Sequence, residues 1–298
     1  MPNIEVGESF YKVLEETAKD LYIKAQKDIP PDVRAALKKA IEQETNSNAK
    51  QMMQIMQKAI DVADERDMLV CQDTGIPVYY VTIGTALNVD GAKIREAITT
   101  GVRRATKEHP LRSSVCSPIK RENNQDSTGK HVPVIHWDFK ADADYLDVLM
   151  IPKGSGSEQM TFLKMLVPAE GVKGIKKFVL DCAVEAGGNP CPPTIIGVGI
   201  GGTAEVCVGL AKKAAYRPVG SRNPDPEIAA LEEELFKAVN SLDSGPQGLG
   251  GVTTCFDLHI EDAWTHITQN PVAVTFQCWR GERRRAKLWA DGRVEIGY

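Results

Sequence analysis

Apolar residues at three- and four-residue intervals predict three helices at the start of the chain. The pattern runs through residues 11–27, 31–44 and 48–66, and side chains spaced in this way share one face of a helix. Two consecutive prolines separate the first two helices, because proline cannot donate the hydrogen bond that a helix interior requires. We therefore expect residues 1–66 to form a helical N-terminal region.

From residue 67 onward, strand-like and helix-like patterns mix. Runs rich in β-branched and aromatic residues predict strands, and three- and four-residue spacing predicts helices between them. The predicted strands are 76–84, 132–139, 145–151, 195–202, 253–260, 271–280, 285–290 and 293–297, the last two forming a hairpin around an Asp-Gly turn. The predicted helices are 90–108, 172–186, 203–216 and 226–242.

These patterns together predict a mixed α/β (α+β) fold. We expect a single domain spanning residues 1–298, in which the helical N-terminal region packs on a mixed β-sheet with surrounding helices in residues 67–298. The strands at 132–139 and 145–151 resemble a neighbouring pair. The second of them leads into a glycine-rich turn that is expected to open a helix at residue 159.

Composition and charge narrow the class of protein. The formal net charge of the 298-residue chain is −4, so its balance of charges supports neither nucleic acid nor an anionic membrane as the main partner. No apolar run approaches the roughly 18 residues of a membrane span, and the first residues lack the pattern of a secretory signal. The seven scattered cysteines favour reduced thiols over a disulfide framework. We expect a cytoplasmic globular protein.

A thiol, an amide and a carboxylate stand together in the turn Cys71-Gln72-Asp73-Thr74-Gly75, directly before the predicted strand at 76–84. Such a turn could present reactive groups, or it could simply join two strands around a buried cysteine. The Asp73 carboxylate likewise has two interpretations. It could take part in chemistry, or it could only close the turn, because aspartate commonly does so by accepting hydrogen bonds from backbone amides. This stretch alone leaves both open.

The cysteines fall into different surroundings. Cys71, Cys191 and Cys278 each stand at a turn or strand end, whereas Cys182 and Cys207 lie in helical apolar patterns typical of a core. The absence of any Cys-x-x-Cys pair excludes a zinc ribbon or a ferredoxin-type cluster. Three thiolates from distant turns could hold a four-iron cluster with one iron open to water or substrate. They could equally be isolated buried thiols.

Two further segments have alternative interpretations. The turn at 154–158, Gly-Ser-Gly-Ser-Glu, could bind a carboxylate or phosphate through backbone amides at a helix start, or could be a simple capped turn with Ser157 as N-cap. The polar loop at 111–129 is long enough to be functional, although a solvated surface loop explains it as well.

The glycine run at 197–202 matches the dinucleotide-binding fingerprint literally. That fingerprint requires a following strand with an acidic residue about 20 positions on. Residues 217–226 occupy this place and are too rich in proline to form a strand. We interpret the glycines as the result of tight packing between a strand and a helix.

Four stretches together resemble the iron–sulfur hydro-lyase family, which includes class I fumarate hydratases and L-tartrate dehydratases. They are Cys-Gln-Asp-Thr-Gly from residue 71, Lys-Gly-Ser-Gly-Ser-Glu from 153, Cys-Pro-Pro from 191 and Gly-Pro-Gln-Gly from 245. The likeness extends from about residue 10 to the C-terminus. It implies that Cys71, Cys191 and Cys278 ligate a [4Fe-4S] cluster with one open iron site.

The resemblance also implies roles for other residues. Asp73 corresponds to an aspartate implicated in proton transfer. His266 corresponds to a histidine that reaches the active site of its own chain or of a neighbouring chain. The implied substrate contacts are Gln72, Arg112 and the turn Gly154-Ser155-Gly156.

Single-chain members of this family continue into a second domain with further substrate-binding residues, whereas this chain ends at Tyr298. The chain therefore resembles an α subunit whose active site is completed by a β subunit, in an αβ heterodimer or an α2β2 assembly. The implied reaction on a C4 dicarboxylate is the reversible hydration of fumarate to (S)-malate. Dehydration of L-tartrate is the alternative, although the turn at 154–158 looks more like that of fumarate hydratases.

The sequence disfavours two other classes of protein. A regulatory protein that holds a cluster without catalysis is disfavoured because Asp73, Arg112 and His266 are all present. A nucleotide-binding module would rest on the glycine run at 197–202 and lacks the required context.

Overall fold

Helices and strands are distributed over two units in the computed structural model, which describes residues 4–298. The first unit comprises residues up to 28, residues 63–154 and residues 282–298, and the second comprises residues 29–62 and 155–281. Each unit contains helices and its own sheet of mixed strand direction, which confirms the mixed α/β fold. No helix of the described chain is both long and apolar enough to cross a membrane.

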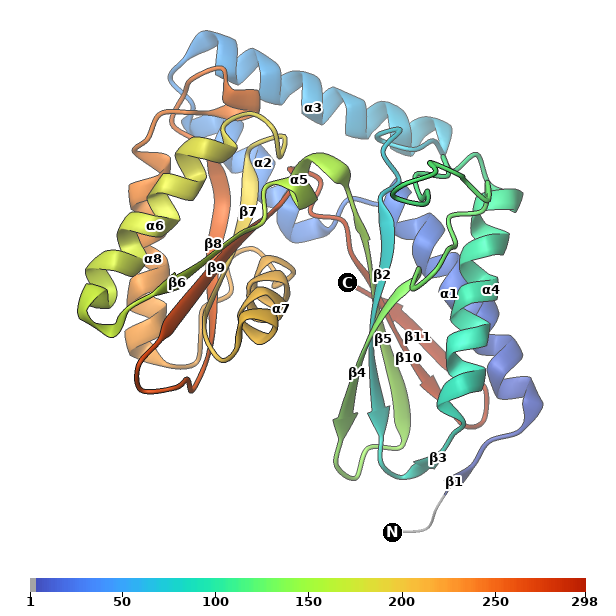
Figure 1. The fold of residues 1–298 in the computed structure, drawn as a ribbon. Coiled ribbons are helices and arrows are strands. Elements are labelled where there is room, and N and C mark those ends of the chain that lie inside the picture. The colour runs from blue at the N-terminus through green and yellow to red at the C-terminus, as the bar shows by residue number, and fades with distance from the viewer. Residues whose placement is uncertain (1–3) are drawn as a thin grey trace. The chain divides into compact units, whose positions relative to one another are not determined.

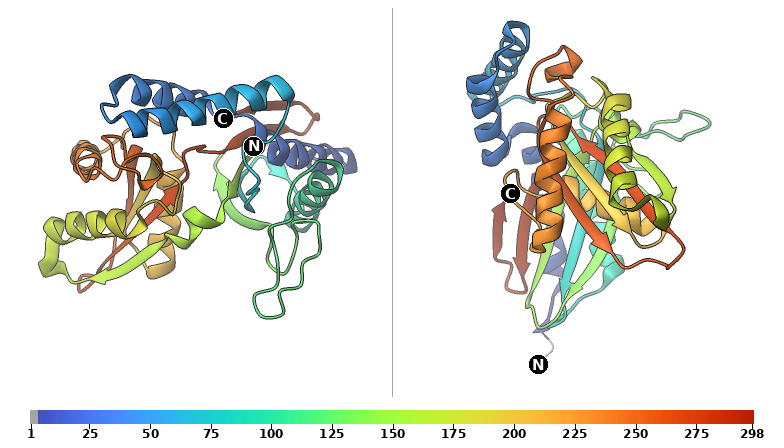
Figure 2. Two further views of the ribbon diagram at one scale, coloured as in Figure 1. Left: turned by 90° about the horizontal axis from the view of Figure 1, so that it is seen from above. Right: turned by 90° about the vertical axis from the view of Figure 1, so that its left-hand side faces the viewer.

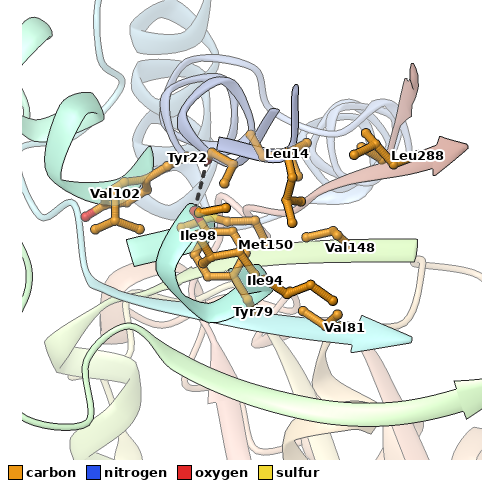
Figure 3. Packing of buried hydrophobic residues seen from close by; sticks show 14 of the residues in the cluster. Leu14, Tyr22, Tyr79, Val81, Ile94, Ile98, Val102, Val148, Met150 and Leu288 are labelled. Atoms are coloured by element: carbon orange, nitrogen blue, oxygen red, sulfur yellow. Dashed lines mark hydrogen bonds between the residues drawn. The ribbon is translucent and has the colours of Figure 1, made fainter. Parts of the chain in front are cut away.

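The first unit is built on a five-stranded sheet in the order β11-β10-β5-β2-β4. Two helices, α1 and α4, lie side by side against it (Figure 1). Tyr22 of α1, Ile98 of α4 and Tyr79 of the sheet are completely buried between these layers (Figure 3). The elements of this unit are β1 (Ile4–Glu5), α1 (Glu8–Lys27), β2 (Ile76–Gly84), β3 (Leu87–Asn88), α4 (Gly91–Glu108), β4 (Val134–Lys140), β5 (Tyr145–Lys153), β10 (Arg284–Trp289) and β11 (Val294–Gly297).

The local pattern predicted these elements closely, except for the two-residue strands β1 and β3, but it placed one strand beside the wrong neighbour. The expected pairing of 132–139 with 145–151 is wrong, because β2 lies between β4 and β5, parallel to the first and antiparallel to the second. Most residues of β2 are buried, which suits a central strand, whereas β4 is largely exposed, which suits an edge. Alternation within a strand predicts its faces and not its neighbours.

The second unit is built on a four-stranded sheet in the order β6-β9-β7-β8. Helices α6 and α8 cover one face and α7 covers the other (Figure 1). The elements of this unit are α2 (Pro31–Gln43), α5 (Ser155–Gln159), β6 (Phe162–Leu166), η1 (Pro168–Glu170), α6 (Gly171–Ala186), β7 (Thr194–Gly201), α7 (Ala204–Ala215), α8 (Pro226–Asn240), η2 (Pro246–Gly248), β8 (Cys255–Ala263) and β9 (Asn270–Gln277). A further helix, α3 (Ser47–Arg66), begins in this unit and ends in the first.

The helix expected from residue 159 is wrong. Only the five-residue α5 forms, with Ser157 inside it rather than at its N-cap, and the chain then enters β6. Phe162 at the start of β6 packs edge-on against Phe276 of β9, with ring centroids 6.5 Å apart. Pairing with β9 therefore overrides the local tendency to continue the helix. So short a helix gives little support to the anion site that was expected at its start.

The interpretation of the glycine run as close packing is confirmed. A Cβ atom on Gly199 of β7 would lie 2.0 Å from the carbonyl oxygen of Cys207 in α7. Since real Cβ atoms do not approach an oxygen so closely, only glycine allows α7 to rest on this strand. The stretch that follows α7, residues 216–225, contains no strand.

Replacing Gly199 by alanine should therefore destabilise the protein strongly. We expect Gly199→Ala to lower the free energy of unfolding by about 3 kcal/mol, the upper part of the range for overpacked cores. The matched control is Gly209→Ala on α7, where a Cβ meets nothing within 4 Å. That change should be neutral or stabilise by about 0.5–1 kcal/mol. Thermal unfolding of both variants measures the difference, and equal stabilities would contradict the packing argument.

Candidate active site

The turn that carries Cys71 lies immediately before β2 in the first unit. Cys71 and Gln72 are exposed, whereas Thr74 is completely buried. The carbonyl oxygen of Thr74 accepts hydrogen bonds from the Tyr22 hydroxyl at 3.0 Å and from Nε2 of Gln26 at 2.8 Å. Both donors belong to α1. The turn is therefore fixed to the core through Thr74 while its thiol remains accessible.

Asp73 makes the hydrogen bond that was expected if its role is to close the turn. Its Oδ1 accepts a hydrogen bond from the backbone amide of Gly75 at 3.0 Å. The geometry is thus compatible with turn closure alone and with turn closure combined with proton transfer.

Arg112 is tied to the same turn. It lies in the long loop between α4 and β4, which contains no strand or α-helix of its own (Figure 2). The Thr74 hydroxyl donates a hydrogen bond to the Arg112 carbonyl across 38 residues of sequence. Further along the loop, Ser113 bonds Asn123 and accepts a hydrogen bond from the Ser127 amide. The side chain of Arg112 is exposed on a loop that hydrogen bonds hold in place.

Cys191 and Cys278 lie next to each other in the second unit. Cys191 precedes β7, and Cys278 directly follows β9. Since these strands are antiparallel neighbours, both cysteines stand at the same end of the sheet. The carbonyl oxygen of Cys191 accepts a hydrogen bond from the amide of Trp279 at 3.2 Å. The structure thus brings together two of the three predicted cluster ligands.

Cys191 occupies a backbone conformation that favours glycine. Its φ angle is 56°, in the left-handed region that costs a side-chain-bearing residue about 1 kcal/mol or more. Gln247 of the Gly-Pro-Gln-Gly stretch supports the next residue, donating to the Pro192 carbonyl from its backbone amide and from Nε2, both at 3.0 Å. A cysteine held at a position where glycine would be more stable is a candidate functional residue.

The glycine-serine turn carries the chain from the first unit into the second, with Gly154 in the first and Ser155 and Gly156 in the second. Within the second unit, a Cβ atom on Gly156 would lie 2.5 Å from the carbonyl oxygen of Asn189. The turn therefore packs against the segment that leads to Cys191. Four stretches of the second unit, around residues 156, 191, 247 and 278, meet at this end of the sheet.

His266 lies at the opposite end of the same sheet. It is in the connection between β8 and β9, in which Thr265 and Gln269 donate hydrogen bonds to the carbonyl oxygen of Gly202, one residue beyond the end of β7. The eight residues of β7 span roughly 25 Å at about 3.3 Å per residue. The structure thus separates His266 from the Cys191 and Cys278 of its own chain by more than a side chain can bridge.

The His266 ring is oriented by its own loop. The backbone amide of Thr268 donates to Nδ1 of His266 at 3.2 Å, so the neutral ring carries its proton on Nε2. The side chain is exposed. Its Nε2–H is therefore available to a group outside the loop.

The three buried cysteines, Cys182, Cys207 and Cys255, are unsuited to binding iron. Burial raises the pKa of the Cys182 thiol to about 12 and that of Cys207 to about 11. Burial likewise raises the pKa of Cys255 well above the usual range. Because the thiolate is the form that ligates a metal, these three residues are packing residues, as the sequence predicted for the first two.

The predicted ligands are chemically suited to an iron–sulfur cluster. Cys71 and Cys191 are exposed and Cys278 is half-buried, and no cysteine in residues 4–298 forms a disulfide. Accessible thiols are what such a cluster requires. Within the described part of the chain, no three acidic, histidine or cysteine side chains are gathered closely enough to hold a metal ion. Two of the ligands belong to the second unit and Cys71 to the first.

Sequence reasoning missed the support beneath the Cys71 turn. Thr74 is part of the stretch that suggested the site, but its hydrogen bonds join segments from three parts of the chain. Nothing in the sequence marks Tyr22 and Gln26 for this role. Tyr22 fits the apolar face of a helix, and Gln26 is a polar residue that is ordinary on a helix surface. Only the tertiary structure identifies them.

Comparisons with known proteins find relatives along most of the chain. Residues 15–288 match the model of a family described as fumarate hydratase (Fumerase). A Methanocaldococcus jannaschii protein, provisionally named L(+)-tartrate dehydratase subunit alpha, is 40% identical over 283 residues, which cover 94% of this chain and 99% of the relative. The L(+)-tartrate dehydratase subunit alpha of Escherichia coli strain K12 is 35% identical over 267 residues, or 88% and 86% of the two chains.

The two classes of cysteine should differ in reactivity once metal has been removed. After treatment with a chelator under reducing conditions, iodoacetamide at pH 8 should modify Cys71, Cys191 and Cys278 first. Cys182 and Cys255 should react only after unfolding, because burial keeps them protonated and inaccessible. Mass spectrometry of peptides follows each site, and denatured protein provides the fully modified control. Modification of Cys255 as fast as Cys191 would show that the cysteines are wrongly assigned.

Proposed function

Because the chain belongs to the fumarate hydratase (Fumerase) family, we propose that it is the α subunit of a [4Fe-4S]-dependent hydro-lyase. The proposed reaction is the reversible hydration of fumarate to (S)-malate. The observation that carries the proposal is the backbone pairing of Cys191 with Trp279, which brings the backbone of Cys191 next to the residue that follows Cys278.

The proposed cluster ligands are Cys71, Cys191 and Cys278. When bound, the cluster supplies a Lewis acid at its one open iron, which lowers the pKa of a water or hydroxyl group. The assignment takes one ligand from the first unit and two from the second. It is supported by the contrast between these accessible thiols and the three buried ones.

The first unit supplies three of the residues proposed to act on the substrate, Gln72, Asp73 and Arg112. Hydration of a double bond needs a proton delivered to carbon, and we assign this proton transfer to Asp73, two residues from a proposed ligand. Arg112 is assigned to a substrate carboxylate, because a guanidinium meets a carboxylate through two parallel hydrogen bonds. Gln72 and the turn at 154–156 complete the proposed substrate contacts.

His266 is proposed to serve the active site of a neighbouring copy of the chain. Its place at the far end of the sheet from Cys191 and Cys278 supports this choice over a role in its own site. Trp264 and Ile267, which flank it, are 100% and 88% exposed. Large apolar side chains exposed together are typical of a surface that contacts another protein.

A β subunit is proposed as the partner that completes the active site, in an αβ heterodimer or an α2β2 assembly. The support is the naming of the relatives as alpha subunits. Their names also make L-tartrate the second candidate substrate. Fumarate, malate and L-tartrate are all C4 dicarboxylates, so the same guanidinium contact serves each of them.

An assay of the assembled enzyme tests the proposal. The chain is purified anaerobically together with its β subunit, and loss of fumarate is followed by ultraviolet absorbance, with L-tartrate in parallel. We expect kcat/KM for fumarate to exceed that for L-tartrate by about tenfold or more, a difference of about 1.4 kcal/mol in transition-state binding. The reverse ratio would identify a tartrate dehydratase. Turnover of neither substrate would refute the proposed function.

Asp73→Asn separates proton transfer from turn closure. Asparagine has nearly the same shape and closes such turns well, but it cannot exchange a proton. If Asp73 transfers the proton, kcat should fall about a hundredfold or more, the usual scale of general acid–base catalysis. Iron content should remain that of the unaltered protein. Near-normal turnover of the reconstituted variant would leave Asp73 as a turn residue only.

A further inference from the structure

The buried Thr74 connects two segments of the first unit that have different proposed roles. One segment carries Asp73, proposed to transfer a proton, and the other carries Arg112, proposed to bind a substrate carboxylate. Resting on the hydro-lyase function, we propose that Thr74 is a positioning residue, which holds the Asp73 carboxylate and the Arg112 guanidinium in register for a C4 dicarboxylate. Thr74 touches neither substrate nor cluster in this proposal. It acts through the residues on either side of its hydrogen bonds.

The backbone of Thr74 is fixed to the core of the first unit. Its relative exposure is 0%, and its carbonyl oxygen accepts from the hydroxyl of Tyr22 and from Nε2 of Gln26. Both donors are themselves completely buried. Two hydrogen bonds from one helix to one carbonyl leave this residue little freedom to move. The adjacent Asp73 is therefore held at a defined place relative to α1.

The side chain of Thr74 makes the second connection. Its hydroxyl donates to the backbone carbonyl of Arg112. The other donor to that carbonyl is the exposed Ser114 hydroxyl, at 3.5 Å, which is at the limit of a hydrogen bond. The buried hydroxyl of Thr74 is thus the stronger of the two constraints on the Arg112 backbone.

Thr74 consequently fixes the backbone positions from which the side chains of Asp73 and Arg112 extend. Asp73 precedes Thr74 in the chain and bonds the amide of Gly75, which follows it. Arg112 is joined to Thr74 by the hydroxyl. A guanidinium binds a carboxylate through two directed hydrogen bonds, so a small shift of its backbone weakens the contact. Loss of the Thr74 hydroxyl should therefore reduce substrate affinity before it affects the chemical step.

Three substitutions separate the hydroxyl from the shape of the residue. Thr74→Val keeps the volume and removes the donor, whereas Thr74→Ser keeps the donor. Ser114→Ala removes the longer, exposed bond to the same carbonyl and serves as the matched control. Arg112→Lys sets the scale of the effect, because it removes the bidentate contact itself.

The variants are purified with the β subunit and intact cluster, and binding of succinate, an unreactive C4 dicarboxylate, is measured by calorimetry. We expect Thr74→Val to weaken succinate binding about five- to tenfold, the effect of one lost hydrogen bond. KM for the substrate should rise by a similar factor, while kcat and iron content change less than about twofold. Thr74→Ser and Ser114→Ala should bind succinate as the unaltered protein does.

A purely structural role would give a different result. Thr74→Val would then lower the melting temperature or the iron content and leave succinate affinity unchanged, and Thr74→Ser would not restore the loss. Either result overturns the inference, as does an equal loss of affinity in Ser114→Ala. If Thr74→Val does not fold, Thr74→Ala tests the same hydroxyl, with the same expected loss of affinity. Failure of the proposed function would instead appear in the unaltered protein, as absence of both turnover and succinate binding.

Discussion

The hydrogen bond from the Trp279 amide to the Cys191 carbonyl is the contact on which the second unit's part of the proposed active site depends. It joins the segment that enters β7 to the segment that leaves β9, and so sets Cys191 beside Cys278. Gln247 holds the following residue, Pro192, by two further hydrogen bonds. Gly156 packs against the residues before it. A strained cysteine is thus supported from several directions, which is how a functional site retains a conformation that local preference opposes.

In the first unit, too, surrounding contacts hold the backbone that carries the proposed functional groups. Cys71, Gln72 and Arg112 present exposed side chains, yet the backbone between them is anchored by the buried Thr74. Reactive groups on loops act with precision only when the backbone beneath them is held by a packed scaffold. Here α1 provides the anchor, since its core face packs on the sheet while Tyr22 and Gln26 reach the turn. Packing, hydrogen bonding and proposed catalysis are therefore linked through one residue.

The sequence predicted local features well because they depend on neighbouring residues. The helix predicted over 90–108 forms as α4, and the Asp90 carboxylate caps it by accepting hydrogen bonds from the amides of Ala92 and Lys93. The sheet order and the strand β6 could not be predicted, because pairing between distant segments leaves no trace in local periodicity. The division into two units could not be predicted either, because each unit is assembled from segments that are far apart in the sequence. The distance of His266 from Cys191 and Cys278 became apparent only from the strand register in the structure. Cys71, Cys191 and Cys278 were already distinguished in the sequence by their places at turns and strand ends.

The most direct test of the account is the cluster content of single cysteine variants, purified anaerobically with the β subunit. Iron and sulfide analysis, together with electron paramagnetic resonance, should show loss of the cluster in Cys71→Ser, Cys191→Ser and Cys278→Ser. Cys182→Ser should retain it, because Cys182 is a packing residue of α6. Retention of a full cluster without Cys278 or Cys191 would contradict the account, since the pairing of these two residues would then have no chemical purpose.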